Sequence, residues 1–544
     1  MKNVLIIGSG ISGLSCAIKC AELGICTTLV SPFPSERSQS VMAAGGINAV
    51  LSDNNENDSV ESHIEDTLKG GCYLGGKKAV TGLCGRAEEI IGFLERIGTV
   101  FSVNRLNRPI KRAFGGQSHK RTCYCGSSTG KQIVSALVME ARKYEAAGLI
   151  KRRLWSDFHS ALIRDGKCYG ALLYVESSGA LEAVCADAVV IATGGQNAVF
   201  GKTTGSTQCD GYTAGKLFLQ GVELKNLEFI QYHPTTLETP QKKMLVSEAV
   251  RGEGGRLFYN DKGRRVYFME DKYGSRGNLM TRDIISREIF MADREVFLDI
   301  SFLDKKLIDG RLPEVRDLCQ KYRGIDISKK PIPVAPSVHF FMGGIAVHLD
   351  HETNIRDLYA VGECASMYHG ANRLGGNSLL AAIYSGWVAA ETIAGKESSG
   401  KTEDFSGTVE KETAALKSKM NTKSNFPVMY VRDMLAGTMC SKLGIVRNSS
   451  ALDEGMRDID YYLSVADKIN YDPSVLPYFN YSLKGILTLS KAIIACAMNR
   501  TESRGAHYRS DHPESKDELC CSTIISYNNE DLRVRFDKEH EYES

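Results

Sequence analysis

The stretch from His369 to Leu380 combines an anion-binding side chain with a backbone that can approach a ligand closely. It reads H-G-A-N-R-L-G-G-N-S-L-L, and Arg373 presents a planar fork of donors shaped for a carboxylate or a phosphate. The following apolar run predicts a helix starting near Ser378 and Leu379, whose N-terminus would direct free N–H groups at an anion. Glycines let the backbone come close to such a ligand. The stretch therefore favours an anion site, although a surface arginine before a helix would have the same composition.

Two histidines and a charged cluster precede this stretch. His233 lies in Q-Y-H-P-T, where the following proline holds its backbone extended, and His339 lies between an apolar run and a double glycine. The charged cluster comprises Ser247, Glu248 and Arg251 in S-E-A-V-R-G-E-G-G, and Arg282 in T-R-D. From the residues alone, each histidine is as readily a hydrogen-bonded core residue. The Glu–Arg pairs are as readily a surface ion network.

The N-terminus carries a dinucleotide fingerprint in the required setting. A predicted strand over 3–7 leads into Gly8-Ser9-Gly10-Ile-Ser-Gly13, a helix through residue 23 and a second strand over 26–30. This arrangement predicts a diphosphate at the helix N-terminus. Ser31 ends the second strand where a nicotinamide dehydrogenase would carry an acid, which argues for another dinucleotide.

Further polar and glycine-rich turns extend this prediction. A loop over 37–48 suits a flat ring system, a strand over 188–191 runs into A-T-G-G, and a strand from 357 ends in Gly-Glu. A polar turn over 204–211 carries Asp210, whose carboxylate could bind a hydroxyl. The cofactor-binding candidates are Gly8, Ser9, Gly10, Gly13, Ser31, Ser38, Gln39, Ser40, Gly45, Gly46, Ala192, Thr193, Gly194, Asp210, Glu363, Ser378 and Leu379. Together the motifs point to FAD.

The composition limits the possible function classes. A chain of 544 residues forms about two to four domains. A formal net charge of +2 gives no electrostatic case for nucleic acid or an anionic membrane. The 16 cysteines include no C-x-x-C, which argues against a zinc or iron–sulfur site within this chain, and no metal site is expected. No apolar run approaches the ~20 residues that span a bilayer. We expect a cytoplasmic protein that reaches a membrane, on its cytoplasmic face, only through partners.

The motifs resemble, in order, those of the flavoprotein subunit of the succinate dehydrogenase/fumarate reductase family, which includes L-aspartate oxidase. The resemblance runs from residue 2 to about 525. It implies an α/β fold with a Rossmann-type FAD-binding domain over 1–225 and 345–395. An α+β capping domain over 226–344 is inserted, and a C-terminal helical domain covers 396–544. Residues 396–404 read as a linker, with helices near 405–421 and 484–500. Another helix has Leu452 and Ile459 on its apolar face and Ser450 and Asp453 as a capping pair.

The resemblance also implies roles for the charged residues. His233, Ser247, His339 and Arg373 would bind the carboxylates of a small dicarboxylate. Arg282 would be the proton donor, and its proton would be replaced through Glu248 and Arg251. Phe114, in R-A-F-G-G-Q-S, offers an apolar contact where aspartate oxidases carry a glutamate for the substrate ammonium, so fumarate or succinate is favoured.

Two departures from the family pattern matter for the cofactor. Gln39 occupies the position of the histidine that carries covalent FAD, and Ala44 replaces a glutamine. An amide cannot form the histidyl–flavin bond, so we predict non-covalent FAD and a bias towards fumarate reduction. An iron–sulfur subunit is the expected electron partner. The alternatives are an L-aspartate oxidase and a flavin-binding module without turnover.

Overall fold

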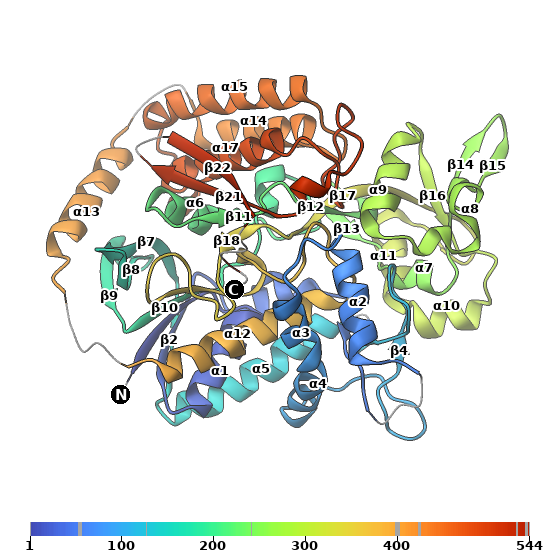
Figure 1. Cartoon of the computed structure of the whole chain (residues 1–544), viewed down its shortest axis with the longest axis horizontal. Coiled ribbons are helices and arrows are strands. Elements are labelled where there is room, and N and C mark those ends of the chain that lie inside the picture. The colour runs from blue at the N-terminus through green and yellow to red at the C-terminus, as the bar shows by residue number, and fades with distance from the viewer. Residues whose placement is uncertain are drawn as a thin grey trace.

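A five-stranded parallel sheet forms the first layer of the fold (Figure 1). The computed structural model describes residues 2–52, 57–126, 128–240, 242–397, 403–422, 426–528, 531–538 and 542. The sheet has the order β19-β10-β1-β2-β6, and its strands are β1 (Asn3–Ile7), β2 (Cys26–Ser31), β6 (Ile150–Leu154), β10 (Ala188–Ile191) and β19 (Leu358–Ala360). Helices α1 (Ile11–Glu22), α5 (Thr129–Ala146) and α12 (Asn377–Gly395) pack together beside it. The predicted Rossmann-type strand–turn–helix–strand unit is confirmed.

A second, antiparallel sheet carries the capping region, drawn in green to yellow in Figure 1. Its six strands follow the order β13-β12-β17-β16-β14-β15. They are β12 (Ile230–Glu238), β13 (Lys243–Leu245), β14 (Arg256–Asp261), β15 (Arg264–Val266), β16 (Val296–Asp299) and β17 (Ile332–Phe341). The helices of this region are α7 (Ala249–Gly252), α8 (Phe268–Tyr273), α9 (Arg282–Met291), α10 (Lys305–Arg311) and α11 (Pro313–Arg323). A separate apolar core that includes Leu257, Ile285 and Leu298 stabilises the region.

A third sheet joins distant parts of the chain, in the order β20-β18-β11-β21-β22. Its strands are β11 (Leu224–Lys225), β18 (Gly344–Ala346), β20 (Ala365–Ser366), β21 (Ser522–Asn528) and β22 (Asp531–Asp537). The strands of the cap lie between β11 and β18 in the sequence, and the domain boundaries at residues 225 and 344 stay a prediction. The two C-terminal strands were not predicted, so the C-terminal region is not helical throughout.

The C-terminal helices differ in part from the prediction. Helices α14 (Val428–Lys442), α15 (Ser449–Val465) and α17 (Leu483–Asn499) pack together, and Leu452 and Ile459 are buried as predicted. Helix α13 (Ser406–Met420) instead packs on β9 (Ala180–Cys185), away from α14, α15 and α17 (Figure 1). The cap of α15 is Asn448, which accepts a hydrogen bond from the Ala451 N–H at 2.9 Å, so the capping pair proposed above was wrong. Residues 398–402 of the predicted linker lie outside the described residues.

Candidate active site

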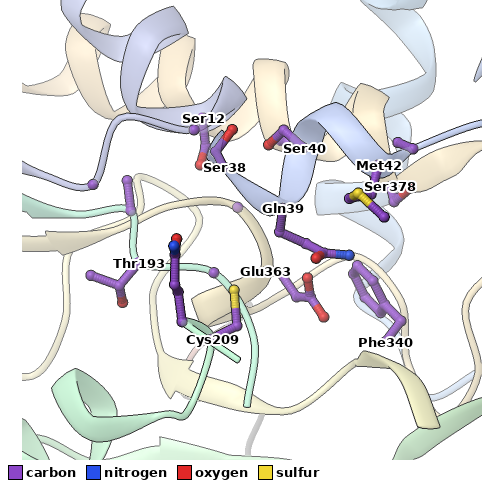
Figure 2. A pocket seen from close by; sticks show the side chains of 18 of the residues that line it. Ser12, Ser38, Gln39, Ser40, Met42, Thr193, Cys209, Phe340, Glu363 and Ser378 are labelled. Carbon is purple, nitrogen blue, oxygen red and sulfur yellow. The ribbon is translucent and has the colours of Figure 1, made fainter. Parts of the chain in front are cut away.

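A cavity of about 500 Å³ lies between the parallel sheet, the cap and the N-terminus of α12. Its lining joins the glycine turn after β1, the loop around Gln39, strand β12 and helix α9. Figure 2 shows Gln39 extending into the cavity towards Glu363 and Phe340. The volume is in the range of known ligand pockets. No described helix is long and apolar enough to cross a membrane.

The glycine turn brings the backbone to the cavity because a side chain would not fit there. Gly8 has φ of +110°, and a Cβ at this residue would lie 2.3 Å from the Ala192 carbonyl oxygen. A Cβ on Gly13 would lie 1.9 Å from the Gly8 carbonyl oxygen, so this glycine permits close contact between α1 and β1. Gly10 directly precedes α1 and faces Ser40 Oγ. The turn therefore leaves room for a diphosphate at the N-terminus of α1, as the sequence predicts.

The polar atoms of the loop after β2 fit a flavin dinucleotide. Ser38 Oγ and Gln39 Oε1 are buried and have no hydrogen-bond partner among the described residues. Buried polar atoms are nearly always satisfied, and a molecule bound in the cavity would supply the missing partners. The predicted cofactor residues in the cavity lining are Gly8, Ser9, Gly10, Ser31, Ser38, Gln39, Ser40, Gly45, Gly46, Ala192, Thr193, Gly194, Glu363, Ser378 and Leu379. The residues present therefore fit FAD.

The candidate substrate residues line the same cavity. They are Phe114, His233, Ser247, Glu248, Arg282, His339 and Arg373, which come from the cap, the FAD-binding part and the loop before β5 (Thr122–Cys123). The His233 and His339 rings lie 5.1 Å apart between centroids. The pairing of β12 with β17 shifts register on both sides of His233, and such bulges redirect side chains. The fold thus brings together groups that lie far apart in the sequence.

Arg282, Glu248 and Arg251 form a buried ion network. Arg282 donates from Nε and Nη2 to Glu248 Oε2, at 2.9 and 2.7 Å. Arg251 Nη2 lies 3.5 Å from Glu248 Oε1, which also accepts from the Gly115 N–H at 2.8 Å. Arg251 is not part of the cavity lining and lies behind Glu248. Glu248 therefore lies between Arg282, which also lines the cavity, and Arg251, which does not.

Gln231 connects the two guanidiniums that face the cavity, and it was not singled out in the sequence. Its Oε1 accepts from Arg282 Nη1 and from Arg373 Nη2, each at 3.0 Å. Its amide nitrogen donates to Asn372 Oδ1 at 2.8 Å. Asn372 in turn donates to Asp283 Oδ1 at 2.9 Å. A single amide thus sets the spacing of both cations.

His233 and His339 are in the neutral form near pH 7. Burial lowers the pKa of His233 well below its usual value, and the nearby Arg282 and Arg251 lower it further. The pKa of His339 is lowered in the same way by burial and by Arg282. His339 Nδ1 lies 3.0 Å from Thr204 Oγ1. Neutral imidazoles can donate one hydrogen bond each to a carboxylate without adding charge.

Glu248 stays ionised although it is buried. Burial raises its pKa, but the charges of Arg282 and Arg251 and the Arg282 hydrogen bonds outweigh this and lower the pKa to about 2. Among the described residues no carboxylate forms an ion pair with Arg373: burial lowers its pKa well below the usual value, Arg282 lowers it further, Glu363 and Glu248 oppose this only in part, and its Nε is unsatisfied. A bound anion would oppose both effects on Arg373.

Two of the predicted cofactor residues, Gly13 and Asp210, are not part of the cavity lining. The Asp210 carboxylate accepts from the hydroxyl of Tyr478 and lies 3.4 Å from the guanidinium of Arg432. The end of the cavity beside the carboxyl end of β2 is lined by residues with no motif, including Asp157 and Phe158 on β7 (Ser156–Arg164). No glycine pattern marks this end, so the sequence offered no signal for it.

Comparisons with known proteins agree with this geometry. A family described as FAD binding domain matches residues 3–379, and one described as fumarate reductase flavoprotein C-term matches residues 432–542. The succinate dehydrogenase flavoprotein subunit of Bacillus subtilis is 36% identical over 547 residues, which cover 96% of this chain and 93% of that protein. A fumarate reductase (CoM/CoB) subunit from Methanothermobacter marburgensis is 33% identical over 542 residues, covering 96% of this chain and 97% of that protein.

Two further relatives widen the comparison. An L-aspartate oxidase from Pyrococcus furiosus is 32% identical over 531 residues and covers 97% of this chain and 99% of that protein. The solved structure of E. coli quinol fumarate reductase superposes with a TM-score of 0.90 at 28% identity, covering 98% of this chain and 96% of that chain. The chain is therefore an FAD-dependent oxidoreductase that belongs to the succinate dehydrogenase/fumarate reductase flavoprotein family, whose members include L-aspartate oxidase.

Proposed function

We propose that this chain interconverts fumarate and succinate with non-covalently bound FAD and works mainly as a fumarate reductase. The observation that carries the proposal is the convergence of Arg282 and Arg373 on one Gln231 oxygen, in the cavity that also holds His233 and His339. A flat diacid needs donors at both ends, and this end of the cavity supplies them. Arg373 and His339 would bind one carboxylate, and His233 and Ser247 the other.

The charge of the site matches a dianion. Arg251, Arg282 and Arg373 are buried around a single ionised carboxylate, that of Glu248, which leaves an excess of positive charge. Glu363 also lines the cavity, but burial raises its pKa to about 7, so it offsets this excess only in part. A substrate with two carboxylates neutralises the site, whereas one with an added ammonium brings back a positive charge. Phe114 lines the site and offers no group to that ammonium.

FAD, when bound, supplies the hydride that is exchanged with one alkene carbon. Arg282 delivers a proton to the other carbon, so that fumarate, a hydride and a proton together give succinate. Holding both carboxylates fixes the near-attack geometry, which is worth up to about 7–11 kcal/mol of barrier in well-oriented reactions. The neutral histidines orient the diacid without competing for the proton.

The ion network allows an arginine to act as the acid. An arginine side chain is ordinarily always charged, because its pKa lies above ~12. When Arg282 gives up its proton, Glu248 loses the main influence that holds its pKa low, and burial then favours the protonated carboxyl. Glu248 then takes a proton from Arg251 and passes it to Arg282, and Arg251 in turn regains a proton from the solvent. The relay therefore works because each proton transfer changes the pKa of the group that takes part in the next transfer.

Electrons must reach the flavin from outside the chain. Two of the relatives are named as subunits, one of a fumarate reductase and one the flavoprotein subunit of a succinate dehydrogenase. Together with the expectation of no metal site in this chain, this supports an electron donor that is a separate iron–sulfur subunit. Any contact with the cytoplasmic face of a membrane would then be made through partners.

A substrate assay tests the proposal. Purified protein would be given fumarate with a reduced dye, and succinate or L-aspartate with an oxidised dye. We expect turnover of fumarate and succinate, faster in the reducing direction, and none of L-aspartate. Aspartate turnover would favour the oxidase alternative, which the Pyrococcus furiosus relative supports. No turnover of any acid by FAD-loaded protein would leave the flavin-binding module.

A further inference from the structure

The C-terminal region supplies part of the wall of the cofactor cavity. The residues concerned line the same cavity as the glycine turn: Leu476 directly precedes the short helix α16 (Pro477–Tyr481), and Tyr478 and Phe479 lie within it. We name these three residues the latch. Leu476 is 43% exposed, so the latch lies where the cavity meets the surface. The position is unexpected from the sequence, because α16 comes after every other element that lines the cavity.

Aromatic contacts connect the latch to the part of the cavity beside the carboxyl end of β2. Tyr478 packs against Tyr481 at 5.7 Å between ring centroids, and Tyr481 packs against Tyr174 at 5.6 Å. Tyr174 pairs in register with Asp157, which lines the cavity and follows Leu154, the partner of Ser31 at the end of β2. The latch therefore covers the end where the nucleotide part of FAD would lie when its diphosphate sits on α1.

An ion pair between Arg432 and Asp210 contacts the latch. Arg432 of α14 lies 3.4 Å from Asp210, donates to the Phe479 carbonyl at 3.4 Å, and has its guanidinium 4.8 Å from the centre of the Phe479 ring. Arg432 also donates to the hydroxyl of Ser482. The Tyr478 hydroxyl donates to Asp210, whose carboxylate is 2% exposed. Asp210 thus binds the C-terminal region and is not among the residues that line the cavity.

We propose that the latch, whose Tyr478 and Phe479 are clamped by Arg432 on Asp210, closes the outer end of the cavity and slows the release of FAD. This proposal rests on the non-covalent attachment proposed above. A cofactor without a covalent bond is retained only by its contacts, so closure by aromatic rings would govern its dissociation rate. Aromatic rings also provide a flat apolar surface against which an adenine can stack.

The test measures FAD release and does not depend on turnover. Holoprotein would be diluted and the rise in fluorescence of released FAD followed for Arg432→Gln, Phe479→Ala and Tyr478→Phe. We expect release to be at least tenfold faster for the first two, equivalent to about 1.4 kcal/mol, and less affected for Tyr478→Phe, which keeps its ring. Matched controls are Arg457→Gln on α15 and Tyr430→Ala on α14, both exposed, and both should release FAD at the original rate. Rates within twofold of the original for Arg432→Gln and Phe479→Ala would overturn the latch.

Two further measurements keep the outcomes separate. Acid precipitation comes first: flavin in the pellet refutes non-covalent attachment and the latch with it. Flavin in the supernatant together with unchanged release rates refutes the latch alone. If the variants do not fold, amide hydrogen exchange of residues 474–482 is compared in the unaltered chain with and without FAD. We expect exchange to slow on FAD binding, and no change would overturn the proposal.

Discussion

Replacing Arg282 by lysine tests the chemical role of this residue without removing its charge. Arg282 makes three hydrogen bonds in the buried site, two to Glu248 and one to Gln231. A lysine ammonium can stay paired with Glu248, but it cannot keep all three hydrogen bonds and also face a substrate carbon. Hydrogen bonds to charged groups contribute about 1.5–3 kcal/mol each, so the loss of two weakens the positioning by about 3–6 kcal/mol. Loss of a positioned acid alone costs about 10²- to 10⁴-fold in rate.

We therefore expect kcat of Arg282→Lys for fumarate to fall by about 10³-fold or more while the FAD content stays unchanged. The assay follows oxidation of a reduced dye by fumarate, with FAD quantified by absorbance in the same preparation. Arg294→Lys is the matched control, because Arg294 is half exposed and pairs with Asp261 on the surface of the cap. A kcat within tenfold of the original enzyme, at full FAD content, would refute the assignment of Arg282 as the acid.

Three further outcomes follow from the site. Arg373→Gln should lower kcat/KM for fumarate by about 10²- to 10³-fold with FAD retained, because a buried carboxylate partner is lost; a loss below tenfold would contradict its role. Glu248 has a folded pKa of about 2, below its unfolded value of about 4.5, so its stabilisation is present above pH 4.5 and is lost as the pH falls towards 2. Urea titrations would measure the difference in unfolding free energy between the original chain and Glu248→Gln. This difference should shrink by about 2 kcal/mol from pH 6 to pH 3. An equal difference at both pH values would be inconsistent with a pKa of about 2. Because Gln39 has no imidazole, acid precipitation should leave FAD in the supernatant.

Local sequence patterns predicted the elements that hold the cofactor. The strands β1, β10 and β19 are short apolar runs followed by glycine turns, and these signals depend only on neighbouring residues. The same holds for Gly8 and Gly13, where an added Cβ would lie only about 2 Å from a backbone oxygen. The resemblance to the family then identified side chains that the fold brings into one cavity.

Contacts between distant segments were not predictable in the same way. Gln231 has no signature of its own, and its importance comes from two arginines that reach it from other elements. Asp210 looked like a ligand for a hydroxyl, but its partner Arg432 lies 222 residues further along the chain. Some signal was overlooked: Leu532, Val534 and Phe536 alternate with charged residues, which is the period of a strand.

The pairing of β11 with both β18 and β21 also bears on how the protein is made. Strand β11 is translated before the middle of the chain, whereas β21 begins only at Ser522. On the ribosome this sheet stays open at one side until β21 has emerged, and α16 emerges only shortly before it. If the latch retains FAD as proposed, stable loading of the nucleotide awaits the emergence of α16, and a chain cut off before β21 has an unpaired strand edge exposed to aggregation.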